Sequence, residues 1–140
     1  MLINRHTRTV EWGDCDPAGI VFYPRYFAYF DDATGRLFAA AGFPKYDMVQ
    51  RFNSVGIPMV DTRSKFYIPS RYGEEIVIES RVTEFRRSSF DVHHRILKGE
   101  ALAVEGFETR VWVAADADKP GGIKAQPIPE EILAAFTVAA

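Results

Sequence analysis

The sequence has 140 residues, 47% of them hydrophobic and 26% charged, and this length and composition suit a single globular domain spanning residues 1–140. A net charge of −2 provides no basic field for nucleic acid. No apolar run approaches the roughly 20 residues of a membrane-spanning helix, and the N-terminus lacks the apolar segment of a secretory signal. The one cysteine, Cys15, cannot form an internal disulfide. We therefore expect a cytoplasmic protein that binds neither nucleic acid nor membrane.

The first predicted strand covers residues 3–11, where β-branched side chains recur, and it ends at Trp12-Gly13. The loop that follows is shaped by Pro17 and Gly19 and carries two aspartates, Asp14 and Asp16. Short acidic side chains bond nearby backbone N–H groups in turns, so one of the two is expected to hold the loop.

The longest helical pattern covers residues 24–41 and begins with Pro24, which suits the first turn of a helix. Its apolar residues fall within a sector of roughly 140° at about 100° per residue, which predicts a buried face. They are Tyr26, Phe27, Phe30, Ala33, Thr34, Leu37, Phe38 and Ala41. Gly42 and Pro44 end the helix. Asp31 lies at the edge of the apolar sector and Asp32 well behind it, so only Asp31 is expected to look into a pocket lined by this helix.

The rest of the chain reads mainly as strands. After a shorter helix over residues 46–54, strands are predicted over residues 59–68, 75–85, 89–97 and 101–115, then a polar loop over residues 116–122 and a terminal helix from Pro129. One apolar helix with long strands predicts an α+β fold, in which an antiparallel sheet of about five strands wraps around the helix. The free edges of such a sheet favour association into a dimer, which extends the sheet and builds clefts at the subunit boundary.

Asp16 is the strongest candidate for a catalytic residue. An aspartate at such a position more often caps a helix or holds a turn, but Asp14 can serve the turn and leave Asp16 free. A free carboxylate beside the N–H groups that open a helix can attack a carbonyl, or direct water at it, while those donors stabilise the carbonyl oxygen. The donor is expected to be the backbone N–H of Tyr23, because Pro24 has none.

The same loop gives little support for a metal or a thiol nucleophile. Paired acids suit hard cations, but the remaining ligands of a calcium loop are absent, and His6, His93 and His94 do not complete a zinc set. Nothing in the sequence places a histidine beside Cys15, so we expect an inert, half-buried thiol. No metal or cofactor is predicted, and a structural or surface role is predicted for His93 and His94.

A compact basic segment, Arg86-Arg87-Ser88-Ser89, joins two predicted strands. Two guanidinium groups and two hydroxyl groups in a tight connection match the oxygens of a phosphate. A solvated hairpin tip is the alternative, but Phe85 and Phe90 on its flanks favour a fixed direction for the basic groups. The segment is too small and isolated to bind nucleic acid.

The aromatic residues of the long helix are expected to serve mostly as core. Phe30 and Asp31 are the exceptions, because an aromatic wall with one acid at its rim could hold a planar acyl group that carries a hydroxyl.

These motifs resemble a known family. The run from Gly13 to Val21, followed by Tyr23-Pro24 and Tyr26, resembles the active-site signature of the 4-hydroxybenzoyl-CoA thioesterase family, in the hotdog-fold superfamily. The Arg86-Arg87-Ser88-Ser89 segment and the Gly56-Ile57-Pro58 step are also similar to that family, and the likeness extends over nearly the whole chain.

The resemblance implies a hotdog fold and hydrolysis of an acyl-CoA thioester, without a cofactor, by a dimer or a dimer of dimers (a homotetramer). It assigns the catalytic aspartate to Asp16 and the carbonyl-polarising backbone N–H to Tyr23. It assigns the coenzyme A phosphate contacts to Arg86, Arg87, Ser88 and Ser89. The expected acyl pocket contains Phe30, Asp31, Ile57 and Pro58.

Several points stay open at the level of sequence. Asp16 would act as a nucleophile or as a general base, and an aryl, hydroxyaryl, branched or short aliphatic acyl group fits the same residues. A non-hydrolytic acyl-CoA binding or regulatory module on the same fold is the alternative function. A hydroxyacyl thioester dehydratase is disfavoured, because no histidine lies near the Asp16 loop in the sequence.

Overall fold

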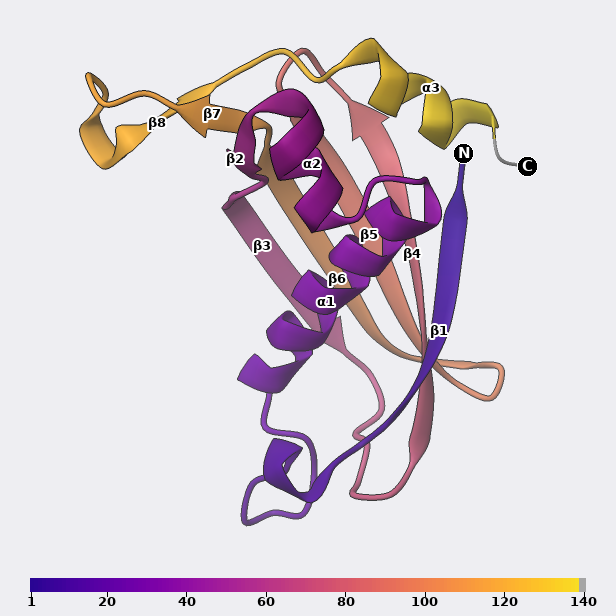
Figure 1. The fold of residues 1–140 in the computed structure, drawn as a ribbon. Helices are drawn as coiled ribbons and strands as arrows, with labels where there is room; N and C mark the ends of the chain where they lie inside the picture. The colour runs from indigo at the N-terminus through magenta and orange to yellow at the C-terminus, as the bar shows by residue number, and fades with distance from the viewer. Residues whose placement is uncertain (139–140) are drawn as a thin grey trace.

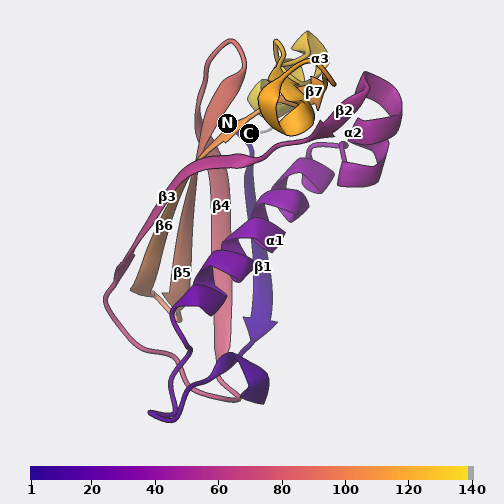
Figure 2. The same cartoon turned by 90° about the vertical axis from the view of Figure 1, so that its left-hand side faces the viewer.

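The structure, a computed structural model, describes residues 1–138, so the last two residues of the predicted domain lie outside its description. A five-stranded antiparallel sheet in the order β1-β4-β5-β6-β3 carries one long helix, α1, across one face (Figures 1 and 2). These elements are β1 (Ile3–Thr9), α1 (Pro24–Ala40), β3 (Met59–Phe66), β4 (Glu75–Phe85), β5 (Ser89–Lys98) and β6 (Ala101–Val111). The predicted α+β architecture, a sheet wrapped around a helix, is confirmed.

Most of the shorter elements surround the C-terminal end of α1 and the adjoining end of the sheet, whereas η1 lies near the start of α1 (Figure 1). A second, three-stranded sheet has the order β2-β7-β8. The shorter elements are η1 (Trp12–Asp14), α2 (Lys45–Phe52), β2 (Ser54–Gly56), β7 (Val113–Ala115), η2 (Pro120–Gly122), β8 (Ile123–Ala125) and α3 (Glu130–Val138). Within the described residues, no helix is long and apolar enough to cross a membrane.

The end of α1 is fixed by a Schellman motif. Gly42 adopts a φ of +96°, which glycine reaches without steric cost, and its N–H donates to the carbonyl of Ala39 at 2.9 Å. The N–H of Phe43 donates to the carbonyl of Phe38, also at 2.9 Å. Phe38 and Phe43 are both buried in the same core cluster, so the turn also closes one end of the core.

The core lies between α1 and the inner face of the sheet and consists of two clusters. One gathers around the C-terminal half of α1 with Phe38, Phe90 and Phe136, and the other around its N-terminal half with Tyr29, Phe30 and Ile78. Tyr29 is 1% exposed and extends the buried face of the helix beyond the predicted sector.

The two edges of the five-stranded sheet are formed by β1 and β3. Strand β3 is exposed along nearly its whole length, and its side chains include the half-exposed Val60 and Phe66. An exposed edge strand with apolar side chains is a template for pairing with another strand.

Most predicted elements match the structure to within a few residues, and two differences have local causes. The strand predicted over residues 101–115 breaks at Trp112, whose N–H donates to the carbonyl of Ser88 and whose carbonyl accepts the N–H of Gln126. These bonds connect Trp112 to the segments that contain Ser88 and Gln126, and β7 begins at the next residue. The strands β2 and β8 have three residues each, too few to show an alternating pattern.

Candidate active site

The loop between β1 and α1 is a narrow hairpin that leads directly into the helix. The N–H of Asp16 donates to the carbonyl of Ile20 at 3.0 Å, and the N–H of Phe22 donates to the carbonyl of Asp14 at 2.8 Å. Gly19, with a φ of +79°, closes the turn. The aspartates are therefore held on a rigid loop beside the first turn of α1.

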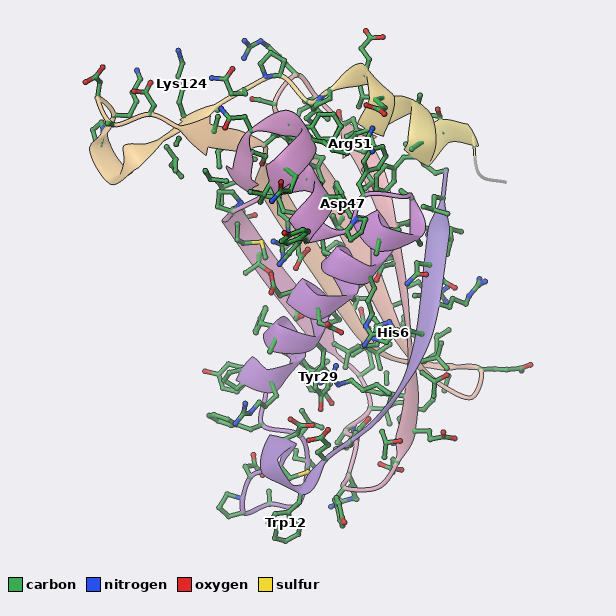
Figure 3. The ribbon with its side chains drawn as sticks, viewed as in Figure 1. His6, Trp12, Tyr29, Asp47, Arg51 and Lys124 are labelled. Atoms are coloured by element: carbon green, nitrogen blue, oxygen red, sulfur yellow. The ribbon has the colours of Figure 1, made fainter. Side chains whose placement is uncertain are left out.

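Asp14 has a structural role. Its Oδ2 accepts hydrogen bonds from the hydroxyl of Tyr29 at 2.7 Å and from the N–H of Glu11 at 3.1 Å. Burial, reinforced by the hydrogen bond to Asp14, raises the pKa of Tyr29, so this hydroxyl remains a donor. Asp14 thus anchors the loop to the buried side of α1, as the prediction of a loop-holding aspartate requires. Figure 3 shows Tyr29 on α1 and Trp12 at the lower end of the molecule, where the loop begins.

Asp16 also contributes to the loop, but with one oxygen only. Its Oδ1 accepts the N–H of Ala18 at 2.9 Å in an Asx turn, and within residues 1–138 its Oδ2 has no hydrogen-bond partner. The side chain is partly buried and borders a hollow of about 400 Å³ whose walls include Trp12 and Tyr72. The rings of these two aromatic residues meet edge to face, with centroids 5.5 Å apart. The hollow therefore offers one available carboxylate oxygen next to aromatic surface.

Tyr23 is the N-cap residue of α1 and is followed by Pro24 at the first helical position. In the described part of the chain, the N–H of Tyr23 donates to no carbonyl or side chain, which leaves it available to a ligand. Tyr23 borders an apolar hollow of about 330 Å³ that also includes Tyr26 and Phe66. The donor predicted from the sequence thus lies at one end of strand β3.

Three residues of the predicted acyl pocket come together at the other end of β3. Asp31, Ile57 and Pro58 line a hollow of about 450 Å³ between α1, α2 and the segment from β2 to β3. Most other side chains around this hollow are apolar, and Lys45 and Arg110 add two positive charges. Asp31 accepts a hydrogen bond from Arg110 Nη2 at 2.9 Å through Oδ1, and its Oδ2 lies 4.0 Å from Lys45 Nζ.

The structure does not bring Phe30 to this hollow. Its side chain is 1% exposed, stacks on the ring of His94 with centroids 4.8 Å apart, and packs against Gly106. Asp31 is the next residue on the helix and points to the side of the helix rather than into the core. Phe30 is therefore a core residue and does not line the hollow.

The basic segment forms the turn between β4 and β5, at the opposite end of the sheet from the Asp16 loop (Figure 1). Arg86 is held by Asp91, at 2.7 and 3.0 Å, and by Glu84 at 3.0 Å, and these bonds raise its pKa. Its Nε donates to Ser89 Oγ at 2.8 Å. The side chain of Arg87 is exposed and has no hydrogen-bond partner among residues 1–138. Arg87 is thus the guanidinium group that is available to an anion here.

A buried polar network that the sequence analysis missed lies under α1. Ser80, His94 and Glu108 come from three adjacent strands, and Thr34 reaches them from the helix. Ser80 Oγ lies 2.7 Å from His94 Nδ1, and Thr34 Oγ1 donates to Glu108 Oε1 at 2.6 Å. His94 Nε2 lies 3.2 Å from both Thr34 Oγ1 and Glu108 Oε1. The network encloses His94, so this histidine is not a partner of the Asp16 loop.

Arg110 connects this network to the hollow that contains Asp31. Its Nε and Nη2 donate to the two carboxylate oxygens of Glu108, each at 3.0 Å. Burial alone would raise the pKa of Glu108, but the hydrogen bonds from His94 and Arg110 outweigh burial and lower this pKa to about 2. Glu108 is therefore charged at neutral pH. Glu108 and Arg110 lie four and six residues after the buried Val104 on β6, so all three side chains point to the same face of the sheet. This alternation is the sequence signal that could have identified Glu108 and Arg110 as inward-facing.

Asp16, Tyr23 and Asp31 border three different hollows, and those with Tyr23 and Asp31 lie far apart within one chain. Strand β3 has eight residues, which at 3.3 Å per residue puts its ends roughly 23 Å apart. The turn with Arg87 is further still from the Asp16 loop, because the two are separated by the eleven residues of β4, which span roughly 33 Å.

Across residues 1–138, no group of three or more His, Cys, Asp or Glu side chains is placed to hold a metal ion.

Comparison with known proteins identifies the family. Residues 10–136 match the model of the thioesterase-like superfamily. The chain is 31% identical over 131 residues to 4-hydroxybenzoyl-CoA thioesterase from Pseudomonas sp. (strain CBS-3), with 89% of this chain and 90% of that protein covered. The chain belongs to the thioesterase-like superfamily. The resemblance stated from the active-site signature is confirmed, and the chain is a member of a family of thioester hydrolases.

Solved structures of this superfamily share the hotdog fold of the chain. An aspartate-to-asparagine variant of 4-hydroxybenzoyl-CoA thioesterase, complexed with 4-hydroxybenzoyl-CoA, superimposes with a TM-score of 0.87 and 28% identity. The match covers 96% of this chain and 98% of that chain. A gentisyl-coenzyme A thioesterase matches with a TM-score of 0.82 and 29% identity, over 96% of this chain and 99% of that chain.

Proposed function

We propose that the protein hydrolyses a hydroxylated aroyl-CoA thioester to the free acid and coenzyme A, with Asp16 as the reacting carboxylate. The observation that carries this proposal is that Asp16 Oδ2 is available for reaction. Asp16 is held on a rigid loop that leads into α1, and the N–H of Tyr23 at the start of this helix is available as a donor. The named activities of the similar proteins, which act on 4-hydroxybenzoyl-CoA and gentisyl-CoA, support the substrate class.

Two forms of the reaction use the same residues. In one, Asp16 Oδ2 attacks the thioester carbonyl and expels the coenzyme A thiolate, and water then cleaves the resulting anhydride to give the acid. In the other, Asp16 removes a proton from a water molecule that attacks the carbonyl directly. In both, the N–H of Tyr23 donates to the carbonyl oxygen as negative charge develops on it. The thiolate takes up a proton and leaves as the free thiol.

A dimer would complete the site. Antiparallel pairing of two β3 edges puts the start of one strand opposite the end of the other. The hollow with Asp31 in one subunit would then lie beside Tyr23 of the second copy, although the two are far apart within one chain. The exposed, partly apolar β3 edge supports this arrangement.

The hollow with Asp31, Ile57 and Pro58 suits the acyl group. Its apolar walls would contact a planar ring, and Asp31 Oδ2 would accept a hydrogen bond from a ring hydroxyl. We propose that Phe30 acts only indirectly, as the support behind this wall.

The phosphates of coenzyme A would bind the turn that carries Arg87, Ser88 and Ser89. Arg86 would contribute mainly by shaping the turn, because Asp91 and Glu84 already occupy its guanidinium group. The distance from this turn to the Asp16 loop favours its contribution to a site on another subunit, as in a dimer of dimers. The single cysteine still predicts a cytoplasmic location for this assembly.

The first prediction concerns Asp16→Asn. Asparagine preserves the Asx turn through its amide oxygen, so the variant is expected to fold, but it supplies neither a nucleophile nor a base. Thiol release from 4-hydroxybenzoyl-CoA should fall by at least about 100-fold, with little change in the thermal unfolding temperature.

Asp116→Asn is the matched control, because Asp116 accepts the N–H of Asp118 at 3.0 Å in the same kind of turn, outside the proposed site. This control should hydrolyse the thioester at the unchanged rate. Near-normal hydrolysis by Asp16→Asn would contradict the catalytic assignment. Binding of acyl-CoA by the unchanged protein without thiol release would favour the non-hydrolytic binding module.

A further inference from the structure

The buried network under α1 contains more charge than the fold requires. The side chains of Glu108 and Arg110 are 1% and 4% exposed, and each would be strongly destabilising if it lost its partner. Apolar residues of similar size would fill the same space at no greater cost in stability. The place where the network reaches the surface is therefore informative.

That place is the hollow with Asp31. Arg110 Nη1 donates to the carbonyl of Ile57 at 3.0 Å, and Nη2 donates to Asp31 Oδ1 at 2.9 Å. Arg110 thus binds two opposite walls of the hollow at once, one on α1 and one on the segment before β3. Glu108 fixes the guanidinium plane through both of its oxygens, and His94 and Thr34 contact Glu108 in turn.

Asp31 needs such a support because its own surroundings are open. Its side chain is 55% exposed, and its only other charged partner is Lys45, at 4.0 Å, among the described residues. An unsupported aspartate at this position would be free to rotate toward solvent. With Oδ1 bound to Arg110, the carboxylate has one orientation, and Oδ2 remains available as an acceptor.

We propose that Arg110, held by Glu108 and His94, is a positioning residue that orients Asp31 toward the acyl group and thereby selects hydroxylated over unsubstituted acyl groups. This inference rests on the proposed function, since it deepens the role of the acyl hollow. The ligand feature recognised is a hydroxyl group, which donates to Asp31 Oδ2. A ring without the hydroxyl would leave this charged acceptor desolvated and unpaired.

The test compares two substrates that differ by one hydroxyl, 4-hydroxybenzoyl-CoA and benzoyl-CoA, by their ratio of kcat/KM. The unchanged protein should prefer the hydroxylated substrate by at least about tenfold, the value of one hydrogen bond to a charged group. Arg110→Lys keeps the buried charge but lacks the planar fork, so the ratio should approach unity. The kcat/KM for 4-hydroxybenzoyl-CoA should fall more than that for benzoyl-CoA, because only the hydroxylated substrate uses the oriented carboxylate.

A double-mutant cycle separates positioning from a structural effect. Asp31→Asn should also remove the preference, and Arg110→Lys should have no further effect on the ratio in that background. Glu108→Gln keeps the guanidinium group of Arg110 but weakens the bonds that fix its plane. This variant should lower the ratio of kcat/KM values partially. Arg95→Lys is the matched control, because Arg95 is also paired with a strand glutamate, Glu79, at 3.0 Å, outside the hollow. It should leave the ratio unchanged.

Binding without turnover gives an independent readout. The Kd values of two non-hydrolysable thioethers, 4-hydroxybenzyl-CoA and benzyl-CoA, should show the same preference and the same loss in Arg110→Lys. If the thioethers follow this pattern but no thioester is cleaved, the proposed hydrolysis is wrong and the positioning role stands. Equal losses for both members of each pair, or an unchanged ratio in correctly folded Arg110→Lys and Glu108→Gln, would overturn the positioning role.

Discussion

Asp31 and Asp32 are adjacent on α1 and have different surroundings, because successive helical residues point about 100° apart. Asp31 faces Arg110 and the hollow proposed for the acyl group, whereas Asp32 faces β1 and accepts hydrogen bonds from Arg36 at 2.8 Å and Arg8 at 3.5 Å. The sequence was sufficient to make this distinction, since Asp31 lies at the edge of the apolar sector. A change at Asp31 should therefore act on substrate recognition, and one at Asp32 on the contact between α1 and β1.

Arg86 and Arg87 are a second adjacent pair with different surroundings. Replacement of Arg87 by alanine should raise KM for acyl-CoA by about tenfold, the loss expected for one charge-assisted contact to phosphate. It should have little effect on an N-acetylcysteamine thioester, which lacks the nucleotide. Steady-state hydrolysis of both esters measures the difference.

Arg86→Ala is the comparison for this prediction. It removes the bonds to Asp91 and Glu84, so we expect a lower unfolding temperature, which Arg87→Ala should not show. An equal loss of hydrolysis for both esters in Arg87→Ala would argue against a phosphate contact at this residue.

The unequal roles of these arginines were not predictable from the sequence. Both guanidinium groups are suitable donors to a phosphate, so the sequence does not distinguish them. Only the pairing of β4 with β5 brings Asp91 and Glu84 beside Arg86. Asp16 could be proposed as a candidate from the sequence alone, since its position before a helix start is visible there. Glu108 and Arg110 were missed because charged residues at buried positions of a strand are unusual, and their further partners, His94 and Asp31, come from other elements.

At the scale of elements, α1 lies close to the sheet because Gly106 on β6 has no side chain. A Cβ atom at this position would lie 2.4 Å from the ring of Phe30, which is confined between Gly106 and His94. Gly106→Ala should therefore lower the free energy of unfolding by about 1–3 kcal/mol through overpacking. Denaturant titration measures this change. It should also disturb the hollow, since Asp31 is the next residue on α1.

Gly35→Ala, on α1, is a control for which the opposite change in stability is expected. The nearest atom to a Cβ there is Lys45 Cε at 3.8 Å, an ordinary contact. Alanine has the higher helix propensity, so this variant should be stabilised by up to about 1 kcal/mol. If Gly106→Ala were as stable as the unchanged protein, the close approach of α1 to β6 would not be required.

The long elements were predictable because each has enough residues to show a period. Helix α1 and strands β4, β5 and β6 have clear apolar spacing, and their bounds match the predictions within two residues, apart from the break at Trp112. Strands β2, β7 and β8 have three residues each; β2 pairs with β7, far along the chain, and β7 pairs with β8 across a short loop. No local pattern of three residues determines such pairing.

At the scale of the whole molecule, one chain carries the parts of the proposed site at separate places. Tyr23 and the Asp16 loop lie at one end of the sheet, and the hollow with Asp31 lies toward the other end of β3. A free β3 edge between two incomplete hollows is the arrangement that a two-fold dimer would complete, because each subunit would then supply what the other lacks. Catalysis should therefore depend on association.

Val60→Lys tests this dependence. Val60 is 61% exposed in the single chain, so the change should cost the subunit little stability, but a lysine on an edge strand opposes pairing. Sedimentation should show a shift toward monomer, and thiol release should fall in parallel as the protein is diluted. Thr7→Lys adds the same charge to the opposite free edge, on β1, and should change neither measurement. If monomeric Val60→Lys hydrolysed acyl-CoA at the unchanged rate, each chain would contain a complete site and the β3 edge would have no part in catalysis.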